Sequence, residues 1–186
     1  MANPSGSTWY SKNQSKYPNS NSINDLSGSF KSVVTKFKKA LEDAGAKVTP
    51  ATTLRDPTRA FLMHWAWTLA KGKVKADKIP SRPGLDIEWD HDDEKESQKA
   101  AQEMVDKFDM ADDAALDSNH LDGNAIDMTI SWSGTLKIKS AKGEDVEITS
   151  SPRNGENKDL QEVGKTYGVV SHKKPSDVNH WSIDGH

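Results

Sequence analysis

The sequence predicts an α+β fold in which helices cover an antiparallel β-sheet. Apolar residues recur at helical spacing mainly before residue 110, whereas the short apolar runs that favour strands concentrate in the second half of the chain. Hydrophobic residues make up only 33% of the sequence, which indicates a modest core with long polar loops. A length of 186 residues favours one domain.

The first 26 residues are rich in Ser, Asn, Pro and Gly, a composition typical of turns and loops. We therefore expect residues 1–26 to form an extended N-terminal arm, with Trp9 and Tyr10 as its anchors to the rest of the protein. Residues 27–186 are expected to form a single domain.

Helices are predicted where apolar residues share one face and turn signals mark the ends. Apolar positions from Phe30 to Leu41 repeat at helical spacing, and Gly45 ends that pattern. Asp56-Pro57 is typical of a helix start, with the aspartate as N-cap and the proline in the first turn. The predicted helices cover residues 29–44, 57–71, 94–108 and 158–167.

Strands are predicted from short runs rich in β-branched and apolar residues. The run from Ala125 to Trp132 is the longest of them, and Lys142-Gly143 marks the turn of a hairpin. The predicted strands cover residues 46–54, 125–132, 135–138, 146–149 and 180–183.

Composition excludes several classes of function. The 25 basic and 28 acidic residues give a net charge of −3, so we expect no nucleic acid partner. The absence of cysteine excludes disulfides, zinc–thiolate sites and cysteine nucleophiles. No apolar run approaches the roughly 18 residues that a transmembrane helix needs, so membrane insertion is not expected. The first residues lack the basic and apolar regions of a secretory signal, so we expect synthesis in the cytoplasm without signal-directed export.

Candidate metal ligands occur in one short segment, Ser118-Asn119-His120-Leu121-Asp122-Gly123-Asn124-Ala125-Ile126-Asp127. A histidine in a turn and an aspartate on the following strand can converge, and both side chains are good zinc ligands. Gly123 allows a sharp turn between them, and Ala125 leaves room beside a metal. Without further ligands, however, His120 is also compatible with an ordinary loop histidine and Asp127 with an aspartate bonded to backbone.

A third ligand and an acid lie near the end of the chain. In Asp177-Val178-Asn179-His180-Trp181, His180 can complete a set of two imidazoles and one carboxylate. Asp177 precedes it by three residues and can act as a general base and then as a general acid. A catalytic zinc with three protein ligands keeps its fourth position open for water.

These motifs resemble those of the zinc D-Ala-D-Ala peptidases. Ser118-x-His120-x-x-Gly123-x-Ala125-x-Asp127 matches the S-x-H-x-x-G-x-A-x-D signature of that family in full. The family includes vancomycin-resistance dipeptidases, D,D-carboxypeptidases and several phage endolysins, and it shares its fold with the hedgehog signalling domain. The resemblance implies that His120, Asp127 and His180 bind Zn²⁺.

Two further segments are similar to the same family. Asp177-x-x-His180-Trp181 resembles its E/D-x-x-H-W segment, which implies that Asp177 is the catalytic acid and base. The stretch 52–57 resembles S-x-x-R-x-P, with Thr52 in place of the serine, and implies that Arg55 stabilises the oxyanion. Pairing of Arg55 with an acid near the helix start is the alternative. We expect Ser118 and Trp181 to shape the pocket or to contact substrate.

The resemblance implies a zinc peptidase that cleaves stem-peptide or cross-link bonds of bacterial peptidoglycan beside a D-amino acid. Such an enzyme would act in the periplasm or the cell wall, either as a phage-type lysin or as an antibacterial effector delivered by a secretion machine and countered by an immunity protein. A non-catalytic, zinc-containing binding module of the same fold is the alternative. Endopeptidase and carboxypeptidase action both remain open.

The other histidines are interpreted as structural. We expect His64 to be packed on its helix, His91 to lie in an exposed acidic loop, and His172 to lie near the site without ligating the metal.

Overall fold

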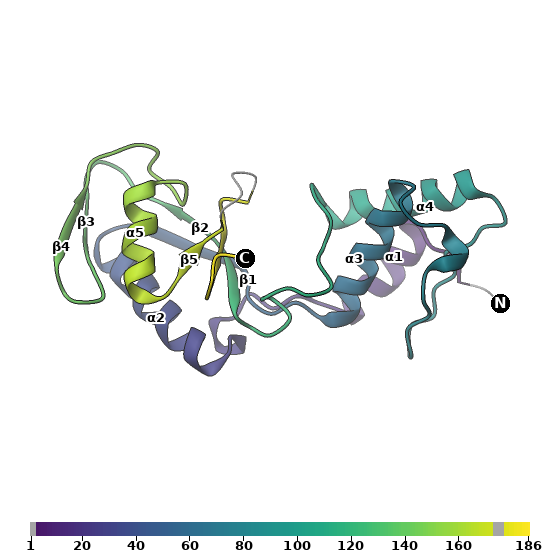
Figure 1. Ribbon diagram of the computed structural model, residues 1–186, viewed down its shortest axis with the longest axis horizontal. Helices are drawn as coiled ribbons and strands as arrows, with labels where there is room; N and C mark the ends of the chain where they lie inside the picture. Colours follow the sequence, from purple (N-terminus) through teal and green to yellow (C-terminus); the bar gives the residue numbers. More distant parts are fainter. Residues whose placement is uncertain (1–2, 173–176) are drawn as a thin grey trace. The chain divides into compact units, whose positions relative to one another are not determined.

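The computed structural model describes residues 3–172 and 177–186, which divide into two compact units (Figure 1). Unit 1 contains the chain up to Pro18 together with Asp56–Asp117, and unit 2 contains Asn19–Arg55 and Ser118–His186. This division differs from the expected arm over residues 1–26 and the single domain over residues 27–186. The chain passes from one unit to the other three times, so neither unit is a continuous stretch of sequence.

Unit 1 is helical. Helix α3, Pro57–Ala70, packs against α4, Glu94–Phe108, and α4 also contacts α1, Ser7–Asn13. Two 3₁₀ turns, Gln14–Lys16 and Ala76–Lys78, complete its regular structure among the described residues. Its core contains Trp9, Leu62, Ala66, Leu69, Trp89, Ala101, Met104, Val105 and Phe108.

Helix α1 replaces the extended arm that the sequence predicts. Trp9 is only 4% exposed, and its indole Nε1 donates a hydrogen bond to the backbone oxygen of Asp86 at 2.7 Å. The residues around Trp9 are polar and typical of a loop, so little in the sequence indicated a helix. Burial of the Trp9 side chain contributes about 2–3 kcal/mol to the free energy of unfolding. The prediction that Trp9 holds this segment to the protein is confirmed, whereas the extended conformation is wrong over Ser7–Asn13.

Unit 2 contains the sheets. Strands β1 (Lys47–Thr52), β2 (Ala125–Ser131), β6 (His180–Ser182) and β5 (Val170–Ser171) form an antiparallel sheet in the order β1-β2-β6-β5. Strands β3 (Leu136–Lys139) and β4 (Asp145–Ile148) form a separate hairpin. The α+β class and the antiparallel pairing predicted from the sequence are therefore confirmed.

Two helices bury the apolar side of this sheet (Figure 1). Helix α2, Gly28–Asp43, contacts α5, Lys158–Tyr167, and β1. A short 3₁₀ turn, Ile23–Asp25, precedes α2. Four residues of α2 at helical spacing, Phe30, Val34, Phe37 and Leu41, are fully buried in the core. The apolar face predicted from the sequence therefore packs against the sheet.

Helix boundaries follow the capping signals. The carboxylate of Asp56 accepts hydrogen bonds from the backbone N–H groups of Thr58 and Arg59, and Pro57 occupies the first turn of α3, as predicted. Asn157 caps α5 by accepting from the N–H of Leu160, while its amide group donates to the backbone oxygens of Ser150 and Pro152. None of the helices within residues 3–172 and 177–186 is long and apolar enough to cross a membrane.

Replacement of Gly164 by alanine is expected to lower the free energy of unfolding by about 1–3 kcal/mol, because the core around it is already filled. A Cβ atom there would lie 2.8 Å from Cζ3 of Trp181 and 2.8 Å from the backbone oxygen of Val169. Gly28→Ala, at a helical position with no atom within 4 Å of its Cβ, is the matched control and should be neutral or slightly stabilising. Urea unfolding of both variants measures the difference; equal stability would contradict the close packing of α5 on Trp181.

Candidate metal centre

Three side chains of unit 2 converge on one point. Nε2 of His120 lies 3.1 Å from Oδ1 of Asp127 and 3.2 Å from Nδ1 of His180, and the last two atoms are also 3.2 Å apart. Within the described parts of the chain, this is the group of His, Asp and Glu side chains that can hold a metal ion. The structure thus brings together the three ligands that the sequence predicts.

Strand register explains why Asp127 and His180 meet. The two residues are direct partners in the antiparallel pairing of β2 with β6, so their side chains project from the same face. On the other side of β2, Asp127 is paired with Thr52 at the end of β1, beside an irregularity in the register between Pro50 and Thr52. Asp127 therefore lies between β6, which carries His180, and the end of β1. The chain after β1 contacts His120 through the backbone N–H of Arg55.

A tight turn before β2 presents His120. The backbone N–H of Leu121 bonds to the oxygen of Ser118 at 2.8 Å, and the N–H of Asn124 bonds to that of Asn119 at 2.8 Å. Gly123 adopts a φ of 66°, and a Cβ there would lie 2.9 Å from the backbone nitrogen of Ser27. Glycine is therefore required both for the conformation and for the close approach of the neighbouring chain, as its place in the motif predicts.

Each imidazole has a backbone acceptor for its second nitrogen. Nδ1 of His120 faces the oxygen of Thr53 at 3.4 Å, and Nε2 of His180 lies 3.1 Å from the oxygen of His186. A backbone oxygen of either residue can only accept, so each of these nitrogens carries the proton when the ring is neutral. The opposite nitrogens, Nε2 of His120 and Nδ1 of His180, then present lone pairs toward Asp127, which is the arrangement that metal-binding histidines adopt.

The spacing of the three atoms fits a small tetrahedral metal ion. With zinc–ligand bonds of about 2.0–2.1 Å, neighbouring ligand atoms of a tetrahedral site lie about 3.3 Å apart. The observed separations of 3.1–3.2 Å are close to that value. The His120 and His180 side chains are 3% and 7% exposed and that of Asp127 is 22% exposed, so an open fourth position would lie on the side of Asp127.

Burial and mutual contact change the acid–base properties of these groups. Burial raises the pKa of Asp127, but hydrogen bonds and charge from His120 and His180 outweigh that effect and hold the pKa well below its usual range. Burial lowers the pKa of His180, but the Asp127 hydrogen bond and charge, the backbone oxygen of His186 and the charge of Asp177 together raise it above its usual value. In the metal-free site, these contacts therefore favour the protonated form of the His180 imidazole.

Zinc affinity is expected to fall by about tenfold for each pH unit below the pKa of His180, because the metal must displace that proton. The pKa of His180 is raised, so the loss begins above the ordinary pKa of about 6.5, while Asp127 stays ionised and does not compete in this range. Calorimetric titration with zinc at pH 6 in two buffers of different ionisation enthalpy counts the protons released. Release of protons on zinc binding is predicted, and no release would contradict the assignment.

Arg55 and Asp177 each contact one of the candidate ligands through the backbone. The backbone N–H of Arg55 donates to the oxygen of His120 at 3.0 Å, and the Arg55 side chain is half-buried. Asp177 is exposed and begins a turn in which its backbone oxygen accepts from the N–H of His180 at 3.3 Å. Its negative charge is one of the contributions that raise the pKa of His180.

Trp181 has a different position from the expected one. Its side chain is 0% exposed and packs against Phe37 with ring centroids 5.6 Å apart. Successive residues of a strand point to opposite faces, so a strand that directs His180 to the metal site directs Trp181 into the core. This burial corrects the expectation that Trp181 lines the pocket or contacts substrate.

Ser118 supports the turn that carries His120. Its Oγ lies 3.4 Å from the backbone nitrogen of His120 and accepts a weak hydrogen bond from it, and the side chain is half-buried. A contact with substrate remains a prediction.

The backbone acceptors of the two imidazoles, Thr53 for His120 and His186 for His180, were not predicted. Both accept through backbone oxygens, which every residue possesses, so the residue type does not indicate that it will contact an imidazole.

The remaining histidines lie outside the group of three. His172 meets the ring of His180 edge-on, with centroids 5.3 Å apart, and does not belong to the metal-binding group of the described residues. In unit 1, Nδ1 of His64 lies 3.0 Å from Oδ1 of Asp113, and Nε2 of His91 lies 3.0 Å from Oγ of Ser5. His64 is half-buried on α3, in agreement with a packed structural role.

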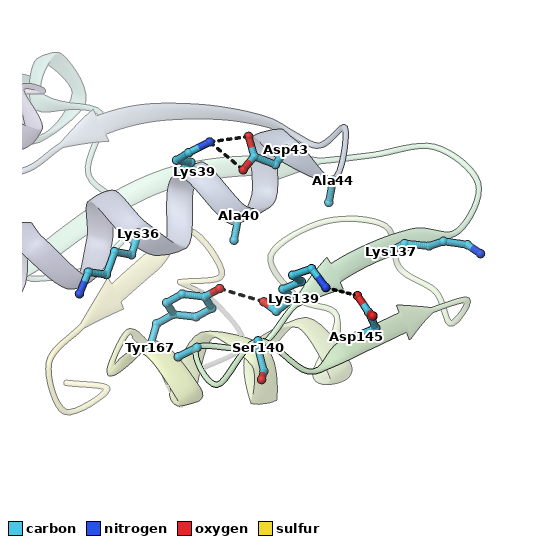
Figure 2. Close-up of a pocket in the computed structure, with 12 residues that line it drawn as sticks. Lys36, Lys39, Ala40, Asp43, Ala44, Lys137, Lys139, Ser140, Asp145 and Tyr167 are labelled. Carbon is cyan, nitrogen blue, oxygen red and sulfur yellow. Dashed lines mark hydrogen bonds and ion pairs between the residues drawn. The ribbon is translucent and has the colours of Figure 1, made fainter.

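A cavity of about 490 Å³ in unit 2 is separate from this site (Figure 2). Residues of α2, the β3–β4 hairpin and the end of α5 line it, with Ala40, Ala44 and Tyr167 contributing apolar surface. Lysines on its walls pair with acids, as Lys39 does with Asp43 and Lys139 with Asp145. The cavity shares no lining residue with the His120, Asp127 and His180 group.

Comparison with models of protein families, with curated proteins and with solved structures found no match for this chain.

Proposed function

We propose that the protein is a zinc-dependent peptidase that cleaves stem-peptide or cross-link bonds of bacterial peptidoglycan beside a D-amino acid. The convergence of His120, Asp127 and His180 on one point, with ligand atoms 3.1–3.2 Å apart, carries the proposal. Two imidazoles and one carboxylate with an open fourth position form a donor set typical of catalytic rather than structural zinc. The resemblance of three motifs in sequence order supports the choice of substrate.

Zinc held there would polarise the scissile carbonyl group and lower the pKa of a bound water to about 7. Asp177 lies one turn before His180 and is exposed, so its carboxylate is free to meet solvent and substrate. In the proposed mechanism, Asp177 accepts the proton of the attacking water and returns it to the leaving amine. Arg55 supplies a positive charge for the oxygen that becomes negative in the transition state.

The retained acid distinguishes this proposal from a zinc-containing binding module. A protein that only binds a ligand needs no group to move a proton, whereas hydrolysis of an amide requires one. Asp177 provides such a group beside the metal ligands without being part of the set of three.

Digestion of purified peptidoglycan followed by mass spectrometry tests the proposed function. Purified protein reconstituted with zinc should release fragments whose masses identify a cut next to a D-amino acid. Prior removal of the metal with a chelator should abolish their release, and added zinc should restore it. Stoichiometric zinc binding without any new fragment would overturn the peptidase proposal and favour the binding module.

A further inference from the structure

We infer that the segment 184–186 acts as an outer clamp of the metal site, fixing His180 in the tautomer that presents Nδ1 as ligand. The inference rests on the metal site of the proposed function, but its positioning residues stand at places that the motifs leave unspecified. Asn119 and Ser182 are the positioning residues, and they act through the backbone of His186.

The clamp begins with the contact between Nε2 of His180 and the backbone oxygen of His186 at 3.1 Å. A neutral imidazole has one donor and one acceptor nitrogen, and either nitrogen can bind a metal. The backbone oxygen only accepts, so it retains the proton on Nε2 and leaves the lone pair on Nδ1. If this oxygen moved away, the proton would be free to occupy either nitrogen and the ring would lose the contact that sets its orientation.

A network of hydrogen bonds holds the backbone oxygen of His186 in place. The amide of Asn119 donates to the oxygen of His186 at 2.8 Å and to Oδ1 of Asp184 at 2.8 Å. The hydroxyl oxygen of Ser182 accepts from the N–H of Gly185 at 2.8 Å and from that of His186 at 3.1 Å. The segment is thus tied both to the strand that carries His180 and to the turn that carries His120.

Strand geometry and a glycine make this arrangement possible. Ser182 lies two residues after His180 on β6, so both side chains project from the same face, and Ser182 is fully buried. Gly185 adopts a φ of 79°, and a Cβ atom there would lie 2.9 Å from Cγ1 of Val170 and 3.1 Å from the backbone oxygen of Ser171. The segment can therefore turn back along β5 only with glycine at this position.

Asn119 connects the clamp to both histidine ligands. It directly precedes His120, and its own backbone oxygen accepts the N–H of Asn124 that closes the turn. Loss of its side chain removes two bonds to the clamp and leaves that backbone bond in place. Loss of the groups that orient a ligand weakens metal affinity by about 10–100-fold.

Zinc titration of Asn119→Ala against a competing chromophoric chelator tests the inference. We expect its affinity for zinc to be about 10–100-fold lower than that of the wild type. Ile183→Ala is the matched control, because Ile183 directly precedes the clamp and its side chain is 48% exposed. This variant should bind zinc as the wild type does. Ser182→Ala provides a second variant that should weaken zinc binding in the same direction if Asn119→Ala unfolds.

A spectroscopic signature separates positioning from a general loss of stability. Long-range ¹H–¹⁵N correlation spectra of the zinc-loaded wild type should show His180 bound through Nδ1, with a protonated Nε2. In Asn119→Ala, the Nε2 proton should exchange faster with water while the protein stays folded. Coordination through Nε2 in the wild type, or wild-type affinity in folded Asn119→Ala or Ser182→Ala, would overturn the clamp.

The outcomes for the clamp and for the peptidase are distinguishable. Wild-type protein that binds zinc through Nδ1 of His180 but leaves peptidoglycan intact would support the clamp and overturn the peptidase. Protein that digests peptidoglycan, with Asn119→Ala as tight a zinc binder as the wild type, would do the reverse. Failure of the wild type to bind zinc at this site would overturn both.

Discussion

Replacement of His120 by alanine is expected to reduce zinc affinity by roughly 100- to 1000-fold. In structural zinc sites with four protein ligands, a binding free energy of about 10–16 kcal/mol corresponds to about 2.5–4 kcal/mol for each ligand. Hydrolysis should fall to the background rate at the same time. The remaining ligands, Asp127 and His180, lie 3.2 Å apart and would hold a metal with two protein bonds only. Zinc content after dialysis, together with competition titration, measures the effect.

The matched control for this substitution is His64→Ala. That histidine belongs to unit 1 and bonds to Asp113 through Nδ1 at 3.0 Å, so its loss should leave zinc content unchanged. Circular dichroism of both variants verifies that each retains its fold. Stoichiometric, tightly bound zinc in His120→Ala would place the metal elsewhere and contradict the assignment.

Asp177→Asn is expected to lower the turnover number by about 100- to 10,000-fold while zinc affinity changes little. Asparagine preserves the size of the side chain and the backbone bond to His180, but it cannot accept and return a proton. Asp177 is exposed, so the substitution should change the free energy of unfolding by less than about 0.5 kcal/mol. Steady-state rates on a purified stem peptide, with zinc content measured on the same sample, verify this expectation.

Asp122→Asn serves as the control for charge near the site. Asp122 is an exposed carboxylate in the turn between His120 and Gly123, and it takes no part in the proposed mechanism. Its replacement should leave the turnover number within about twofold of the wild type. Equal losses in both variants would indicate a general electrostatic effect instead of proton transfer by Asp177.

The boundaries of a helix could be predicted closely where apolar residues recur on one face and a capping residue marks its end. Helix α3 begins at Pro57 because Asp56 bonds to the free N–H groups of its first turn, and α2 has four buried residues at helical spacing. Strand β5 was not predicted, since its two residues are too few to show a pattern. Helix α1 was missed because a single tryptophan stabilises a segment that is otherwise typical of a loop.

No local feature of the sequence indicated the division into two units. Contacts inside unit 1 join the chain before Pro18 to Asp56–Asp117, which are far apart in the sequence. Composition does not change abruptly at residues 18, 55 or 117, and Asp56 serves as a helix cap at one of these crossings. Such a division depends on which residues meet in three dimensions, which periodicity along the chain does not report.

The convergence of the candidate ligands could be predicted from the sequence, but their surroundings could not. The motifs predicted that His120, Asp127 and His180 meet, whereas the partners of the imidazoles are backbone oxygens of Thr53 and His186. The burial of Trp181, in contrast, could have been predicted from the sequence. Alternation along a strand requires that, if His180 faces the metal, its neighbour faces the core.

Diffraction from crystals grown with zinc, recorded at the zinc absorption edge, tests the central claim most directly. The account predicts an anomalous peak about 2.0–2.2 Å from Nε2 of His120, Oδ1 of Asp127 and Nδ1 of His180, with solvent at the fourth position. A peak at another place, or full coordination by protein side chains with no position left for water, would contradict it.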